Sequence, residues 1–124
     1  MSRRLAFLVP ALALGLAATA LAQGPSGVIN AEPNPCTIRR GEKDCTSFLT
    51  WTVQNVSKVK VEVKSEGKEG EKIHVFSTSA ACEGKRCPAP WIRPDTRYVF
   101  RLYDMSTGSP RELNLVRVTA MKEK

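Results

Sequence analysis

The chain has 124 residues and a mass of 13.6 kDa, with 42% hydrophobic residues, 25% charged residues and a formal net charge of +7. This length allows one domain with a single core, and it excludes a multidomain enzyme or a bundle of membrane-spanning segments. The excess of basic over acidic residues makes anionic molecules a class of partner to consider.

The first 22 residues are predicted to be a signal peptide. Two arginines open the chain, residues 5–16 are apolar, and Ala20-Leu21-Ala22 has the small-x-small spacing of a cleavage site. An uncleaved membrane anchor is the alternative, but Pro10 and Gly15 interrupt an apolar run that is shorter than the roughly 20 residues a span needs. The alanine-rich segment is typical of bacterial export. We therefore expect a secreted or periplasmic protein, cleaved near Ala22, whose mature chain has no transmembrane segment.

All four cysteines lie in the expected mature chain, and an even count in a small exported protein predicts disulfides. Four cysteines allow three connectivities, and the distances along the sequence favour Cys36–Cys45 and Cys82–Cys87. A zinc site is the rival reading, but these gaps are wider than the usual spacing of a zinc pair and the chain has a single histidine, His74. No metal or other cofactor is expected.

Short segments in which apolar and polar residues alternate predict strands along the rest of the chain. After a flexible lead-in at residues 23–27, strands are expected at 28–31, 48–53, 59–63, 73–76, 97–103 and 113–120. Residues 65–70 should turn a hairpin, and a further strand between 77 and 91 should be short and irregular because this stretch holds a disulfide loop and two prolines. The apolar phase slips within the last strand, which predicts a β-bulge near residues 115 and 116.

This spacing of strands and turns predicts an all-β protein, an antiparallel β-sandwich of about seven strands over residues 28–121, followed by a basic tail at 122–124. A closed oligonucleotide-binding barrel is the structural alternative. No stretch of the expected mature chain keeps a helical period.

Two local sequence patterns indicate a more specific type of β-sandwich. The run Ser47-Phe-Leu-Thr-Trp51 resembles the second strand of fibronectin type III and related immunoglobulin-like domains, and residues 92–100, with a proline, a threonine and Tyr98, resemble the entry to their sixth strand. The surroundings of Cys36 and Cys45 are similar to immunoglobulin-like modules of bacterial secreted proteins. The resemblance covers residues 27–121 and implies that Trp51 lies in the core and that Tyr98 makes the corner hydrogen bond. The inter-sheet disulfide of antibody domains is missing from the pattern.

The sequence favours a non-catalytic protein. It contains no nucleophile elbow, no Ser-x-x-Lys arrangement and no glycine-rich phosphate loop after a strand. His74 alternates with Ile73 and Val75, so we expect it to be an exposed sheet residue. The fold itself neither requires nor excludes a site.

Binding is the main hypothesis, and the distribution of charge suggests which surface would bind the ligand. In the immunoglobulin-like strand order, alternation places six cations and one aromatic residue on a single sheet face, and Glu62 is the only acid among the residues of the three strands considered. The face comprises Lys58, Lys60, Lys64, Arg97, Arg101, Tyr103 and Arg117. It would suit an anionic glycan or another envelope polymer. Nucleic acid is disfavoured because Tyr103 is the single aromatic residue there. The alternative is that these cations only keep an exposed sheet soluble.

A protein partner is the second hypothesis. The loop Cys82-Glu-Gly-Lys-Arg-Cys87 would present Lys85 and Arg86 in a small disulfide ring, as a protein-binding module or a protease inhibitor would. The alternative is that the loop is an insertion and that its disulfide only protects it from proteolysis. In either case we expect a monomer.

Overall fold

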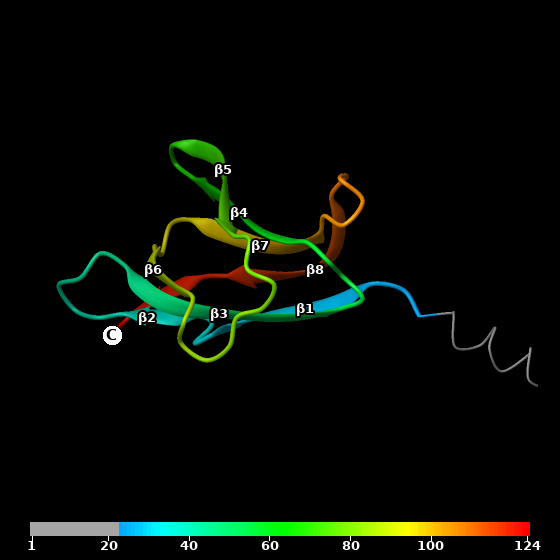
Figure 1. The fold of residues 1–124 in the computed structure, drawn as a ribbon. Coiled ribbons are helices and arrows are strands. Elements are labelled where there is room, and N and C mark those ends of the chain that lie inside the picture. Colours follow the sequence, from blue (N-terminus) through cyan, green and yellow to red (C-terminus); the bar gives the residue numbers. More distant parts are fainter. Residues whose placement is uncertain (1–22) are drawn as a thin grey trace, which may run out of the picture.

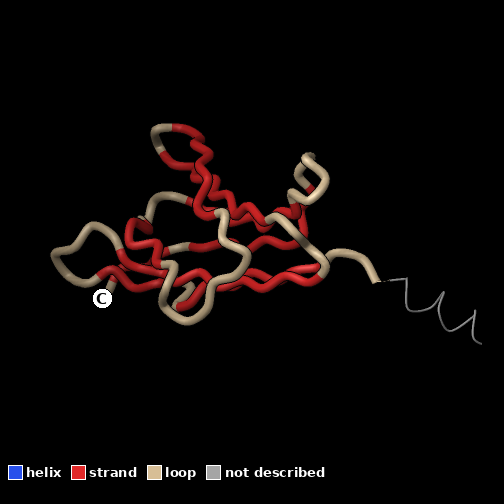
Figure 2. Tube along the Cα trace, in the orientation of Figure 1, coloured by secondary structure: helices blue, strands red, loops and turns tan. Residues whose placement is uncertain are grey.

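The computed structural model describes residues 23–124, and the predicted signal peptide lies outside these residues. The described chain forms nine strands and no helix (Figure 2). In chain order the strands are β1 (Ser26–Glu32), β2 (Cys36–Ile38), β3 (Cys45–Gln54), β4 (Val59–Gly67), β5 (Gly70–Ser77), β6 (Pro88–Ile92), β7 (Arg97–Asp104), β8 (Arg111–Val118) and β9 (Ala120–Lys122). The protein is therefore all-β, with more strands than the seven expected.

Two antiparallel sheets make up most of the fold, as Figure 1 shows. One has the order β1-β3-β6 and the other the order β5-β4-β7-β8, and both orders are open rather than closed on themselves. A short parallel pair, β2 with β9, joins the beginning of the domain to its end. This arrangement is consistent with a β-sandwich.

The core lies between the two sheets. Leu49 and Trp51 of β3 are 0% and 1% exposed, and they share the core cluster with Val61 of β4 and with Phe100 of β7. The alternation in these strands places every second side chain in the core, because successive residues of a strand point to opposite faces. The predicted burial of Trp51 is confirmed.

Tyr98 is also buried, at 5% exposure, and its hydroxyl bonds back to the chain that precedes it. The hydroxyl donates to the carbonyl oxygen of Trp91 (3.1 Å) and accepts from the N–H of Arg93 (3.0 Å). The corner between β6 and β7 is therefore held by a tyrosine, as the sequence resemblance implied.

The predicted bulge in the last strand lies two residues earlier than expected. Leu102 pairs with Asn114 and Tyr103 pairs with Glu112, so Leu113 is the extra residue of β8. Leu113 packs against the core, and the Asn114 side chain accepts a hydrogen bond from the N–H of Ile29 in β1. The extra residue lets Leu113 and the later Val118 both face inward, which is why the apolar phase slips.

The end of the chain also differs from the expectation of a single strand over residues 113–120. β8 ends at Val118, and β9 then pairs with β2, so Lys122 belongs to a strand rather than to a free basic tail. The N–H of Glu123 donates to the carbonyl oxygen of Ile38 at 2.9 Å. At the other end of the domain β1 begins at Ser26, inside the expected lead-in.

Both disulfides have the predicted pairing, Cys36–Cys45 and Cys82–Cys87. The first joins β2 to the beginning of β3, and Cys36 is 1% exposed. Disulfides fit an oxidising compartment. No helix in residues 23–124 is long and apolar enough to cross a membrane.

Candidate functional site

The outer face of the four-stranded sheet carries the residues that alternation assigned to it. Val59, Val61 and Val63 point into the core, so the residues between them point outward, and the same holds in β7. In the ladder Lys60 stands opposite Tyr103. The tentative binding residues on this face are Lys60, Lys64, Arg97, Arg101, Tyr103 and Arg117.

Glu62 is not the only acid on this face. Glu66, Glu71 and Glu112 also lie on this face, and they form ion pairs with its cations. The sequence pattern missed them because the strands are longer than expected and bring these acids into register. The pairs are Lys60–Glu62 at 3.4 Å, Lys64–Glu66 at 3.1 Å, Lys64–Glu71 at 3.3 Å and Arg101–Glu112 at 3.0 Å.

These contacts change the electrostatics of the face. The carboxylates of Glu66 and Glu71 accept hydrogen bonds from Lys64 and raise its pKa above the ordinary value. Partial burial, and then the charge of Glu62, raise the pKa of Tyr103. The ammonium group of Lys60 lies 5.2 Å from the centre of the Tyr103 ring. Three of the predicted cations therefore already have anionic partners within the protein.

Arg97 and Arg117 differ from Lys60, Lys64 and Arg101. Both are exposed, and neither has an ion-pair partner among residues 23–124. They line a hollow of about 340 Å³ together with Lys64, Glu66 and Arg101. Glu66 stands opposite Arg97 in the ladder but forms its ion pair with Lys64, so the two arginines are cations of this end of the face that have no ion pair of their own among residues 23–124.

The Cys82–Cys87 loop lies against the three-stranded sheet. Trp51 and Cys82 exchange backbone hydrogen bonds at 3.0 and 3.1 Å, and the N–H of Leu49 donates to the carbonyl oxygen of Cys87 at 3.0 Å. The ammonium of Lys85 lies 5.7 Å from the centre of the Phe48 ring. The loop thus continues the pairing of β3, and its exposed part is the short turn that contains Lys85 and Arg86.

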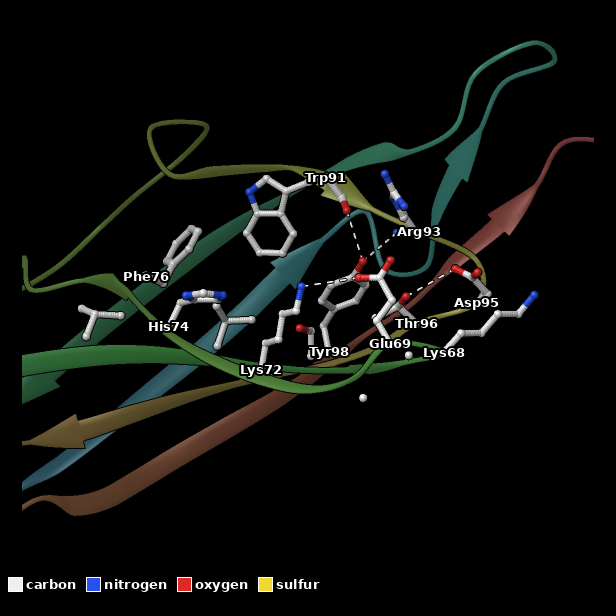
Figure 3. A pocket seen from close by; sticks show the side chains of 15 residues that line it. Lys68, Glu69, Lys72, His74, Phe76, Trp91, Arg93, Asp95, Thr96 and Tyr98 are labelled. Carbon is white, nitrogen blue, oxygen red and sulfur yellow. Dashed lines mark hydrogen bonds and ion pairs between the residues drawn. The ribbon is translucent and has the colours of Figure 1, made fainter.

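A larger cavity lies beside β5, and no sequence pattern had indicated it. This groove has a volume of about 690 Å³ and lies between the β4–β5 hairpin and the β6–β7 corner (Figure 3). Its labelled lining residues are Lys68, Glu69, Lys72, His74, Phe76, Trp91, Arg93, Asp95, Thr96 and Tyr98.

Aromatic rings form one side of the groove. Trp91 stacks on the buried Phe100 with ring centres 6.1 Å apart, and Phe76 meets Trp91 edge-on at 6.4 Å. Trp91 is nevertheless 37% exposed. A tryptophan that is held by a neighbouring ring yet open to solvent offers a rigid apolar contact surface at low entropic cost, a common feature of binding pockets.

Polar groups form the rim. Lys72 bonds Glu69 across the hairpin tip at 3.5 Å, whereas Lys68 and Arg93 have no ion-pair partner among the described residues. His74 is exposed, as predicted, and it also lines the groove. The rim therefore carries a small excess of positive charge around an aromatic surface.

Trp91 was not singled out in the sequence because it follows the segment Pro88-Ala89-Pro90, which predicts irregular chain. The signal that could have found it is its position just before the tyrosine corner. Because Tyr98 bonds the Trp91 carbonyl, a residue at that position is fixed at the edge of the sandwich.

The described residues, 23–124, contain no group of three or more His, Cys, Asp or Glu side chains that could hold a metal ion. No family model matches the chain, and neither the curated proteins nor the solved structures include a significant match to it.

Proposed function

We propose that this protein is an exported, non-catalytic immunoglobulin-like module that acts at the cell envelope by binding a ligand in the groove beside β5. The observation that carries the proposal is the exposed Trp91, stacked on Phe100 at the side of a cavity of about 690 Å³. A large, partly apolar cavity with a few polar groups at its rim is the usual form of a ligand site.

The strand order supports the immunoglobulin-like part of the proposal. In such sandwiches strands A, B, E and D share one sheet and strands C, F and G the other, with an extra strand C′ beside C in some types. When the short β2 and β9 are set aside, β1-β3-β6 has the order A-B-E and β5-β4-β7-β8 the order C′-C-F-G, and no strand of the described residues takes the place of D. The buried Trp51 and the Tyr98 corner agree with it.

Export is supported by the sequence of residues 1–22 and by the two disulfides. Disulfides persist in secreted and periplasmic proteins and are rare in a reducing cytosol.

An anionic glycan or envelope polymer on the sheet face is the second candidate function. The specific observation in its favour is that Arg97 and Arg117 are exposed and have no ion-pair partner in residues 23–124. The ion pairs of Lys60, Lys64 and Arg101 count against it, because a polymer would have to compete with those carboxylates.

A ligand screen with matched variants tests the proposal. The protein without residues 1–22 is screened against anionic glycans, neutral glycans and a displayed library of random peptides, at low and at high salt. Four variant proteins are then compared with the parent. Three of them are Trp91→Ala in the groove, Arg97→Glu with Arg101→Glu on the face, and Lys85→Glu with Arg86→Glu in the disulfide loop. His74→Ala with Lys72→Ala is a second groove variant, whose exposed positions leave folding intact.

A ligand lost in both groove variants and retained in the other two supports the proposal. Loss only in the Arg97 and Arg101 variant, with affinity falling steeply as salt rises, transfers the function to the sheet face. Loss only in the loop variant assigns it to the Cys82–Cys87 loop. If no class of ligand binds at low salt, the binding function is wrong.

A further inference from the structure

Two strand edges border the groove. β5 is the last strand of the four-stranded sheet and β6 is the last strand of the three-stranded sheet. Within the described residues β5 has no strand on its far side, and its only ladder is the one with β4. Such an edge presents a row of unpaired backbone N–H and C=O groups that can accept another strand.

The two edges are not equally open to pairing. Pro88 and Pro90 lie in β6, and a proline has no N–H to donate to a neighbouring strand. β5 is longer, with eight residues, and contains no proline. Of the two edges, β5 is the one that can take a full set of backbone hydrogen bonds.

Apolar side chains are exposed on the outer face of β5. Ile73 and Val75 are 54% and 59% exposed, and their ladder partners are Lys64 and Glu62. Natural edge strands are usually blunted by charges or prolines, and exposed apolar patches mark interaction surfaces. The charged residues of β5, Glu71 and Lys72, lie near its beginning. The second half of this edge therefore has no charged residue or proline that would hinder pairing with another strand.

The inner face of β5 leads into the groove. Phe76 packs edge-on against Trp91, and His74, two residues earlier on the same face, lines the cavity (Figure 3). A strand added beside β5 would therefore direct alternate side chains into the groove, over Trp91, and the others outward beside Ile73 and Val75.

We propose that the ligand is an extended peptide segment of a protein partner, which adds to β5 as a further strand. This inference rests on the proposed function of the groove. In this mode of recognition backbone hydrogen bonds provide affinity and pockets for alternate side chains provide specificity. Apolar side chains would enter the groove, and acidic residues are preferred over basic ones because Lys68, Lys72 and Arg93 outnumber Glu69 and Asp95 in the lining.

A peptide accounts for more of these features than a glycan does. A sugar ring would use Trp91 and the polar rim, but it would leave the unpaired backbone of β5 and the exposed Ile73, which does not line the groove, without a role. A strand engages all of them together.

The test uses peptides selected by the protein itself. Twelve-residue peptides are recovered from a random displayed library with the protein lacking residues 1–22, and the tightest binder is synthesised. Two further versions carry N-methyl groups on alternate backbone nitrogens, one on the odd set and one on the even set. Affinity is measured by titration calorimetry. One methylated version should lose about tenfold or more in affinity and the other should bind nearly as well, because only alternate residues of an added strand bond to β5.

Variants of the protein complete the test. Ile73→Thr with Val75→Thr keeps the β-branched shape and removes apolar surface, so peptide affinity should fall severalfold. Val28→Thr is the matched control, since Val28 is 52% exposed in β1, a strand that does not line the groove, and affinity should not change. Replacing glutamates of the peptide by lysines should also weaken binding.

Three results would overturn the inference, and two of them would leave the proposed function of the groove intact. If no peptide is recovered while a glycan binds and is lost in Trp91→Ala, the groove is a glycan site. If peptides bind but both methylated versions bind equally well, they do not add as a strand. If no peptide and no glycan depends on the groove, the proposed function fails as well.

Discussion

The hydroxyl of Tyr98 donates a hydrogen bond to the carbonyl oxygen of Trp91, 3.1 Å away, and so connects the buried core to the side of the groove. The oxygen of the Tyr98 hydroxyl also accepts a hydrogen bond from the N–H of Arg93 at 3.0 Å. A single phenol thereby fixes the backbone on both sides of Ile92, a fully buried residue. The position of Trp91 in the groove depends on this corner.

Tyr98→Phe should show what the corner hydrogen bonds contribute to stability apart from the buried ring. The ring stays, but the Trp91 carbonyl and the Arg93 N–H lose their buried partner, which typically costs about 1–3 kcal/mol. We expect a lower melting temperature and a red-shifted tryptophan fluorescence as Trp91 becomes more exposed. An unchanged melting temperature would mean that water replaces the hydroxyl without loss.

Trp51→Ala should be far more damaging than Trp91→Ala. Trp51 is 1% exposed and its indole N–H donates to the carbonyl oxygen of Ser79 at 3.0 Å. Truncating a buried tryptophan costs about 3–5 kcal/mol, a large share of the stability of a small domain. Thermal unfolding of both variants, followed by circular dichroism, should show Trp51→Ala unfolded or melting near ambient temperature and Trp91→Ala folded. Equal melting temperatures would contradict the roles given to the two residues.

The fold class, the alternation and both disulfides could be predicted from the sequence because each depends on local pattern. Val59, Val61 and Val63 face inward whatever the neighbouring strand is, and Cys36–Cys45 spans a short loop. The bulge at Leu113 could not be placed, since its position is set by pairing with β7 and by the contact of Asn114 with β1.

The candidate site was harder to predict for the same reason. The outward direction of Arg97 and Arg101 followed from alternation, but the ion pair of Arg101 with Glu112 depends on register across two strands. The groove is lined by residues of β4, β5, β6 and the corner before β7, so it depends on how the two sheets are placed, which the sequence of a single strand does not specify.

Processing and redox state can be checked by mass spectrometry of the exported protein. Cleavage near Ala22 should leave a chain that begins at Gln23. Two bridges remove four hydrogens, so the intact mass should be about 4 Da below that of the reduced chain. Peptide mapping should link Cys36 to Cys45 and Cys82 to Cys87. A peptide joining Cys36 to Cys82 would be incompatible with the fold described.

Asp104 should make the free energy of unfolding depend on pH in the acidic range. The hydroxyl and the backbone N–H of Ser106 donate hydrogen bonds to its carboxylate, the latter at 2.8 Å, and they hold the pKa of Asp104 below its ordinary value. Because the folded state binds this proton less readily than the unfolded chain does, the stabilisation is present above about pH 4 and is lost as the pH falls through the folded pKa.

Asp104→Asn should therefore flatten the loss of stability between about pH 5 and pH 2 in denaturant titrations. Ser106→Ala, which removes the hydroxyl but keeps the N–H, should give an intermediate slope. Identical slopes for the parent and Asp104→Asn would show that this carboxylate has no part in acid unfolding.

The most direct test of the central claim, that the groove beside β5 is the binding site, is a nuclear magnetic resonance footprint. The ¹⁵N-labelled protein without residues 1–22 is titrated with the tightest peptide recovered from the random library. We expect the shifted signals to be the amides of residues 70–77 and the indole N–H of Trp91, while the signals of Arg97, Arg101, Arg117 and the loop from Cys82 to Cys87 stay unchanged. Shifts confined to those arginines or to that loop, with no shift in β5 or Trp91, would show that the groove is not the binding site.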